Sequence, residues 1–183
     1  MLEIIFKLLY LLLPAYFANA SASLVANIRF LKKFDLPLDH YQRLGSNYIL
    51  GPGKTYRGTI TGIIIGLLTA LAQRWLYQNN ILTQYSLINY RQINIWAFGL
   101  LAGCGAMAGD ALASFLKRRL NFKSGQSLPP LDQWDFVIGF FALIFMMVKI
   151  DYSIIISCLT ITLVIHPLSN LIGYKLNLKK VWW

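Results

Sequence analysis

Three of the seven acidic residues lie where they could bind a divalent cation at a membrane edge. Asp132 and Asp135 stand three residues apart at the start of an apolar stretch, so on a helix their side chains point the same way, about 5–6 Å apart. Asp110 lies within another apolar stretch, where an ionised carboxylate costs about 2.5–3.5 kcal/mol and needs a partner or a task. Carboxylate oxygens suit Mg²⁺, which binds one or two of them together with substrate phosphates. The alternative is structural, with Asp132 as a helix N-cap and Asp110 in an ion pair.

Basic and hydroxyl side chains follow Asp110 on the same face of its predicted helix. Ser114 and Lys117 come four and seven residues after Asp110, which places all three on one side of an α-helix. Arg118 lies close to this side of the helix, and Lys123 follows in the next polar segment. We interpret this face as a binding surface for a metal ion or phosphate groups. The alternative is a charge pair between Asp110 and Lys117 through Ser114.

The segment GPGKTYRG, residues 51–58, is a second candidate anion site. Its Gly-Lys-Thr matches the end of a phosphate-binding P-loop, but Tyr48 stands where that motif requires its first glycine, and the context is a membrane helix. Free backbone N–H groups at the start of a helix still attract anions. Lys54, Thr55 and Arg57 would add positive charge and a hydroxyl group. The alternative is a glycine turn with a basic anchor at the membrane surface.

The elements that must position these residues are membrane helices. The chain is 57% hydrophobic and 13% charged, whereas an average soluble domain has about 25% charged residues. Its net charge of +10 is compatible with nucleic acid, an anionic lipid surface or a phosphorylated ligand. The long apolar runs argue against a soluble nucleic-acid-binding protein and leave the membrane surface and phosphates as partners.

Five apolar segments approach the length of about 20 residues that a helix needs to span a bilayer core. They cover approximately residues 2–27, 58–78, 94–117, 133–149 and 151–175. We therefore expect an all-α, polytopic membrane protein that forms one domain over residues 1–183. In the third segment, Gly99, Gly103 and Ala106 recur at intervals of three and four residues. Small residues at this spacing let helices approach closely, so we expect this helix in the middle of the bundle.

Lysine and arginine are concentrated on one side of this topology. They gather in the loop over residues 28–57, in residues 117–130 and in the C-terminal region from Lys175 onward. Cytoplasmic loops of membrane proteins carry an excess of basic residues. With five spans, this rule predicts an N-terminus outside the cell (inner) membrane and places the basic, site-bearing loops in the cytoplasm.

Together these segments resemble the CTP-dependent cytidylyltransferases of lipid synthesis, and most closely the CDP-archaeol synthase family. The resemblance covers nearly the whole chain and includes LPAYFANA, GPGKTYRG, GDALASFLKRRLNFKSG, PPLDQWDFVIG and HPLSNLIGYKLNLKKVWW. The broader phosphatidate cytidylyltransferase signature has the form S-x-x-K-R-x4-K-D, followed later by D-R-x-D. It is matched at Ser114, Lys117, Arg118, Lys123, Asp132 and Asp135. Ser124 and Gln133 replace the Asp and Arg of that signature, which favours the archaeal-lipid branch.

The resemblance implies transfer of a cytidylyl group from CTP to an archaeal-type ether lipid phosphate, such as 2,3-bis-O-(geranylgeranyl)-glycerol 1-phosphate, with release of pyrophosphate. CTP and a lipid phosphate in the bilayer are the expected partners, and Mg²⁺ is the expected cofactor. The implied catalytic residues are Asp110, Lys117, Asp132 and Asp135, and the three aspartates among them are also the implied metal ligands. The implied CTP-binding residues are Lys54, Thr55, Arg57, Ser114, Arg118 and Lys123. The alternatives are a phosphatidate cytidylyltransferase acting on ester lipids, and a non-enzymatic small membrane transporter or structural protein.

Overall fold

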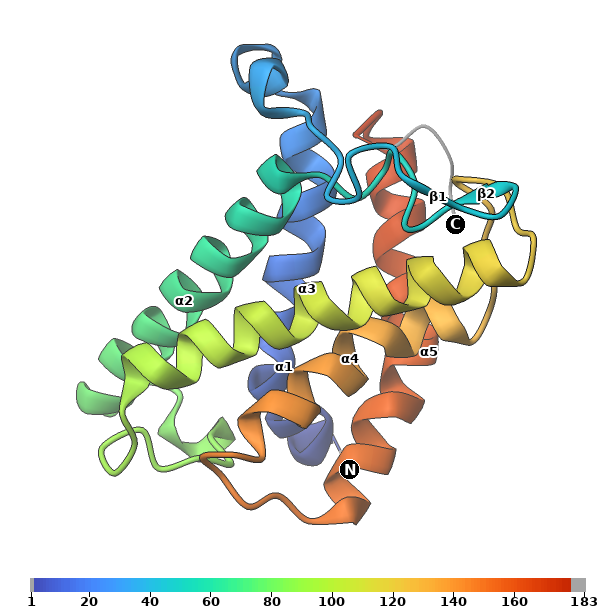
Figure 1. Cartoon of the computed structure of the whole chain (residues 1–183). Coiled ribbons are helices and arrows are strands. Elements are labelled where there is room, and N and C mark those ends of the chain that lie inside the picture. The colour runs from blue at the N-terminus through green and yellow to red at the C-terminus, as the bar shows by residue number, and fades with distance from the viewer. Residues whose placement is uncertain (1, 179–183) are drawn as a thin grey trace.

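The computed structural model describes residues 2–178, which form a bundle of five α-helices (Figure 1). The helices are α1 (Leu2–Leu24), α2 (Tyr56–Gln78), α3 (Ile95–Arg119), α4 (Leu131–Ile144) and α5 (Tyr152–Lys175). Short 3₁₀ turns occur at η1 (Val25–Asn27), η2 (Arg29–Phe34) and η3 (Thr83–Tyr85), and strand β1 (Arg43–Leu44) pairs antiparallel with β2 (Asn47–Tyr48). This architecture confirms the predicted all-α bundle.

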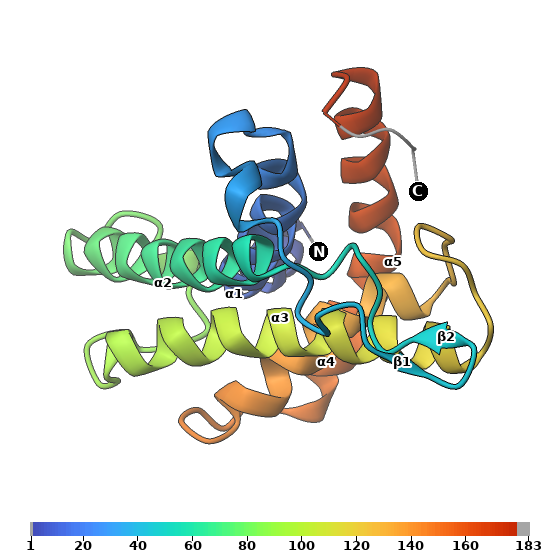
Figure 2. The same cartoon turned by 45° about the horizontal axis from the view of Figure 1, so that its top comes forward.

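Helix α3 lies in the middle of the bundle, as its small residues predict. It contacts α1, α2 and α4, and Figure 2 shows α2 and α4 on opposite sides of it. A Cβ added at Gly103 would lie 2.8 Å from the Cα of Ile63 in α2, and one added at Gly99 would lie 2.9 Å from the Cα of Leu67. The glycines therefore set the separation of α2 and α3.

The crossing of α3 and α4 is closer still. Gly105 and Gly139 face each other, and Gly109 faces the backbone of Asp135. A Cβ at any of these three glycines would overlap a carbonyl oxygen of the opposite helix. Because Asp110 directly follows Gly109, this contact brings Asp110 close enough to Asp135 for their charges to interact.

The core lies between α1, α3 and α4, whereas α2 and α5 expose apolar side chains. Leu12, Phe98, Phe136 and Phe140 are fully buried, while large side chains on α2 and α5 have half or more of their surface exposed: Ile60, Ile64, Leu68, Ile156, Val164, Leu168 and Ile172. Helices that are apolar on all sides are typical of membrane spans. The protein is therefore a multi-pass membrane protein.

Four helical segments in the described chain are long and apolar enough to cross a membrane, namely α1 with η1, α2, α3 and α5. The fourth predicted span, residues 133–149, is a shorter helix than expected. Helix α4 has 14 residues and is about 21 Å long at 1.5 Å per residue, less than the bilayer core of about 30 Å. Residues 145–151 complete the return of the chain to the start of α5 (Figure 1).

Replacing Gly139 by alanine should lower the stability of the bundle by about 1–3 kcal/mol, the usual cost of overpacking. The added methyl group would meet the backbone of α3, which cannot move aside as a flexible side chain can. The midpoint of SDS-induced unfolding of detergent-purified protein measures the effect. Gly53→Ala is the control, since a Cβ at this loop position has no atom within 4 Å. Equal midpoints for both variants would contradict the close α3–α4 contact.

Candidate active site

A cavity of about 940 Å³ lies at the end of the bundle where α3 ends and α4 begins. Its walls come from α1, α3, α4 and α5 and from the loops before α2 and before α4. The predicted site residues that line it are Lys54, Asp110, Ser114, Lys117, Arg118, Asp132 and Asp135. Its volume is in the range typical of ligand sites, about 300–1,000 Å³.

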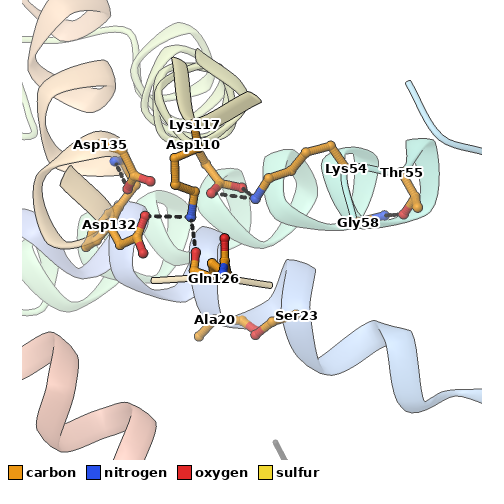
Figure 3. Close-up of polar contacts among 11 residues, drawn as sticks. Ala20, Ser23, Lys54, Thr55, Gly58, Asp110, Lys117, Gln126, Asp132 and Asp135 are labelled. Carbon is orange, nitrogen blue, oxygen red and sulfur yellow. Dashed lines mark hydrogen bonds and ion pairs between the residues drawn. The ribbon is translucent and has the colours of Figure 1, made fainter. Parts of the chain in front are cut away.

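Lys117 joins α3 to the start of α4. Its Nζ donates hydrogen bonds to Oδ1 of Asp132 at 2.8 Å and to the carbonyl oxygen of Gln126 at 3.0 Å (Figure 3). The other carboxylate oxygen of Asp132 accepts a hydrogen bond from the backbone N–H of Leu128 at 2.9 Å. Asp132 thus holds Lys117 and the preceding loop, in addition to being in the first turn of α4.

Lys54 reaches Asp110 from the loop before α2. Its Nζ lies 2.6 Å from both carboxylate oxygens of Asp110, and about a quarter of the lysine side chain remains exposed. The predicted alternative, an ion pair between Asp110 and Lys117, is wrong because each of the two has another partner. Two lysine–carboxylate pairs, both drawn in Figure 3, therefore share one cavity.

Asp135 is the most deeply placed carboxylate of the three. It is 8% exposed, and its Oδ1 accepts a hydrogen bond from the backbone N–H of Phe136 at 2.6 Å. Among the described residues, no ion pair joins it to a lysine or arginine. Asp135 is therefore the carboxylate best placed to receive a cation that arrives with a ligand.

The described residues contain no group of three His, Cys, Asp or Glu side chains arranged to hold a metal ion. The donors nonetheless suit Mg²⁺, which needs only one or two carboxylates when substrate phosphates and waters supply the other ligands. Asp110 and Asp135 are close enough for their charges to interact, and both line the cavity. These two side chains could hold the ion if Lys54 moved from Asp110 to a phosphate group.

Three predicted ligand-binding residues are not among those lining the cavity. Thr55 caps α2, since its hydroxyl oxygen accepts a hydrogen bond from the backbone N–H of Gly58 at 3.2 Å. Arg57 is buried and donates to Oδ1 of Asp35 at 2.8 Å. Lys123 has an exposed side chain outside the lining. Roles for these three residues in binding CTP stay predictions.

The structure adds cavity residues that the sequence left without a role. Asn19 and Ser23 of α1 and His166 and Asn170 of α5 form a polar part of the wall. Their signal in the sequence was polarity within apolar helices, which costs free energy unless the group has a function or a partner. Nothing in the spacing showed that α1 and α5 would face the same space.

Asp39 is a further residue that sequence reasoning missed. Its buried carboxylate accepts hydrogen bonds from the backbone N–H groups of Leu50 and Gly51, both at 2.8 Å, and of Tyr41 at 3.1 Å. Burial opposes the charged form of Asp39, but these hydrogen bonds outweigh burial and hold its pKa below the ordinary value. Asp39 therefore organises the loop that carries Lys54.

The same loop is fastened to the end of α3. The guanidinium group of Arg119 donates to the carbonyl oxygens of Leu44 at 2.8 Å and Tyr48 at 2.6 Å. The side-chain amide of Asn47 donates to the carbonyl oxygen of Arg118 at 3.1 Å. The β1–β2 hairpin thus rests on the helix that supplies Asp110 and Lys117.

The helical bundle, with two lysine–aspartate pairs in a cavity at one end, defines a multi-pass integral-membrane protein with a charged site. The family model described as CarS-like CDP-archaeol synthase matches residues 1–183. The chain is 42% identical to the CDP-archaeol synthase of Methanocaldococcus jannaschii, over 99% of this chain and 98% of that protein. It is 35% identical to the one of Methanopyrus kandleri, over 97% and 92% respectively. The chain therefore belongs to the CDP-archaeol synthase family.

A solved structure also resembles this fold. It is described as an intramembrane enzyme for archaeal membrane lipids biosynthesis, and it matches with a TM-score of 0.70 and 27% sequence identity over 88% of this chain and 91% of the other. Membership of this enzyme family confirms the predicted nucleotidyltransferase and contradicts the alternative of a transporter or structural protein.

Replacing Asp39 by asparagine should misplace Lys54 without removing any group that lines the cavity. Because a displacement of about 1 Å at an active site can cost about a hundredfold in rate, we expect kcat/KM for CTP to fall about tenfold or more, with a higher KM as part of that loss. Steady-state kinetics of the purified variant measure this. Asp151→Asn is the matched control, since Asp151 is exposed and its side chain makes no capping hydrogen bond. An unchanged kcat/KM would show that Lys54 is placed independently of Asp39.

The Asp39 network should weaken in acid. A carboxyl group whose pKa is lowered by folding stabilises the folded state fully above its unfolded pKa of about 3.9 and loses that contribution as the pH falls through the folded value. Hydrogen exchange at Leu50 and Gly51, corrected for the intrinsic rate, should therefore accelerate below about pH 4. In Asp39→Ala, which has no acceptor oxygen at this position, the exchange should already be fast at neutral pH. Protection that persists in the variant would contradict the role of the carboxylate.

Proposed function

We propose that this chain transfers the cytidylyl group of CTP to an archaeal-type ether lipid phosphate, giving a CDP-lipid and pyrophosphate. The observation that carries this proposal is the cavity in which two lysine–carboxylate pairs and Asp135 meet at one end of a membrane bundle. One substrate is soluble in water, and the other keeps its tails in the bilayer, so their reacting groups must meet at the membrane edge. The family membership of the chain supports the same reaction.

The reaction joins two anions, and positive charge is what the site must supply. A phosphate oxygen of the lipid attacks the α-phosphorus of CTP, and the bond between that phosphorus and the oxygen bridging to the β-phosphate breaks. Pyrophosphate leaves with the bonding electron pair. Little covalent chemistry falls to the protein, so catalysis consists of positioning and charge stabilisation. Lys54, Lys117 and Arg118, with the hydroxyl of Ser114, supply these contacts in the cavity.

Mg²⁺ is the proposed cofactor, with Asp110 and Asp135 as its first ligands. When bound, it would neutralise phosphate charge and help align the attacking oxygen with the α-phosphorus. A cation at Asp132 would repel the ammonium group of Lys117, which donates to Oδ1 of Asp132, so Asp132 joins these ligands as Lys117 leaves it. The lysines and the carboxylates therefore exchange partners when CTP and the cation bind.

The acceptor lipid is proposed to approach the wall formed by α1 and α5. Asn19, Ser23 and Asn170 line this side of the cavity, and both helices are membrane spans with exposed apolar surface. A lipid phosphate could thus contact polar groups while its chains stay among apolar side chains. We also propose, from the distribution of basic loops, that the cavity faces the cytoplasm across a cell membrane.

Release of pyrophosphate by the purified protein is the test of this function. The protein in detergent is given CTP, Mg²⁺ and matched lipid phosphates that differ only in ether or ester linkage. Release that requires CTP, the metal ion and the ether lipid supports the proposal. Preference for the ester lipid would favour the phosphatidate cytidylyltransferase alternative. No release from any lipid by protein that is folded and binds CTP would contradict the proposed acceptor class.

Replacing Asp135 by asparagine should lower kcat by about a hundredfold or more, the usual effect of removing one electrostatic group from an active site. The protein should stay folded because the amide oxygen can still accept the hydrogen bond from Phe136. The Mg²⁺ concentration for half-maximal activity should also rise, which separates loss of a ligand from general damage. Asp151→Asn is again the control. Full turnover with an unchanged Mg²⁺ dependence would remove Asp135 from the site.

A further inference from the structure

Residues 28–36, here called the surface segment, expose apolar side chains directly after the first membrane span. The span ends at Asn27, and the segment contains η2. Phe30 is 77% exposed, and Ile28, Phe34 and Leu36 each have more than two fifths of their surface exposed. A connection that faced only water would not carry four large exposed apolar side chains. We therefore expect the segment to face surroundings that are partly apolar.

Positive charge accompanies these aromatic rings. Lys32 and Lys33 are both exposed, and the Nζ of Lys33 lies 5.2 Å from the ring centre of Phe30 and 5.0 Å from that of Phe34. Aromatic side chains concentrate at the level of lipid headgroups, and lysines there are attracted to anionic lipids. The segment presents both kinds of group on one short stretch.

Exposed apolar residues alone do not show what the surface segment binds, but its positive charge does. The connection at the opposite end of the bundle, residues 79–94, also exposes Ile81, Leu82 and Leu87, yet Arg91 is its single basic residue. The surface segment combines comparable apolar exposure with adjacent lysines. This combination fits an anionic membrane surface better than a neutral one.

We propose that the surface segment docks in the headgroup layer beside α1 and binds the phosphate groups of non-reacting anionic phospholipids through Lys32 and Lys33. Phe30 and Phe34 enter the boundary between headgroups and acyl chains. This docking concerns lipids that surround the protein, and it does not depend on which lipid is the acceptor.

Contacts at the end of the segment connect it to the cavity. Asp35 pairs with the buried Arg57 at 2.8 Å, and the carbonyl oxygen of Leu36 accepts a hydrogen bond from the backbone N–H of Tyr56 at 3.0 Å. Two residues further on, the backbone N–H of Leu38 donates to the carbonyl oxygen of Lys54 at 2.7 Å. Docking of the segment would therefore place the Lys54 loop near the level of the headgroups.

Quenching by brominated lipids tests the docking. Phe30→Trp adds an indole at the most exposed position, and its fluorescence is taken as the difference from the parent protein, which has five tryptophans. Both are placed in nanodiscs whose lipids carry bromine near the top of the acyl chains. We expect the added indole to be quenched more as the anionic lipid fraction rises, and less at 1 M salt, because salt screens exposed charges.

Charge reversal provides the matched comparison. In the Phe30→Trp background, Lys33→Glu should raise the anionic lipid fraction needed for half-maximal quenching at least about fivefold, the contribution of one lysine near an anionic surface. Arg91→Glu makes the same change of charge in the connection at the opposite end of the bundle and should leave that fraction unchanged. An indole that is not quenched at all would overturn the docking. Quenching that is equal in neutral and anionic nanodiscs and unaffected by Lys33→Glu would overturn the recognition of anionic lipid.

Discussion

The contact between α3 and α4 is the constraint on which the site depends. Gly105 and Gly109 of α3 meet the backbone of α4, and Gly139 meets that of α3, with no room for a side chain between them. Helices in a membrane have little hydrophobic drive to associate, so close approach of small residues supplies the packing contacts. The same contact places Asp110 beside Asp135. The same helix contact therefore packs the bundle and brings the two carboxylates together.

Ion pairing balances the charge of two carboxylates in the site. Like charges near one another in a partly buried cavity are unfavourable, and removal of one partner from a buried ion pair leaves an uncompensated charge. Lys54 and Lys117 offset Asp110 and Asp132 in the structure. A triphosphate that takes the lysines would leave these carboxylates uncompensated unless a cation arrives with it. If the proposed function holds, this arrangement favours joint binding of CTP and Mg²⁺ over binding of either one alone.

Sequence patterns predicted the parts of this arrangement that are local. The apolar runs gave four helices to within a few residues, and helical periodicity placed Asp110, Ser114 and Lys117 on one face and Asp132 beside Asp135, all of which line the cavity. The predicted end of α4 was wrong because residues 145–148 are apolar but not helical. The partner of Lys54, the role of Asp39 and the position of Arg57 could not be predicted. They depend on how a long loop folds back on α3, and no periodicity records such contacts.

The division between helices and loops also decides which part of the site can adjust to a ligand. The glycine contacts leave α2, α3 and α4 no space to shift toward one another, since close-packed interiors resist small displacements. Lys54, in contrast, is held through hydrogen bonds of its loop to Asp39 and of the hairpin to Arg119. Exposed loops open at lower free-energy cost than packed helices. Exchange of Lys54 from Asp110 to a phosphate group can therefore proceed by movement of this loop while the helices keep the carboxylates in place.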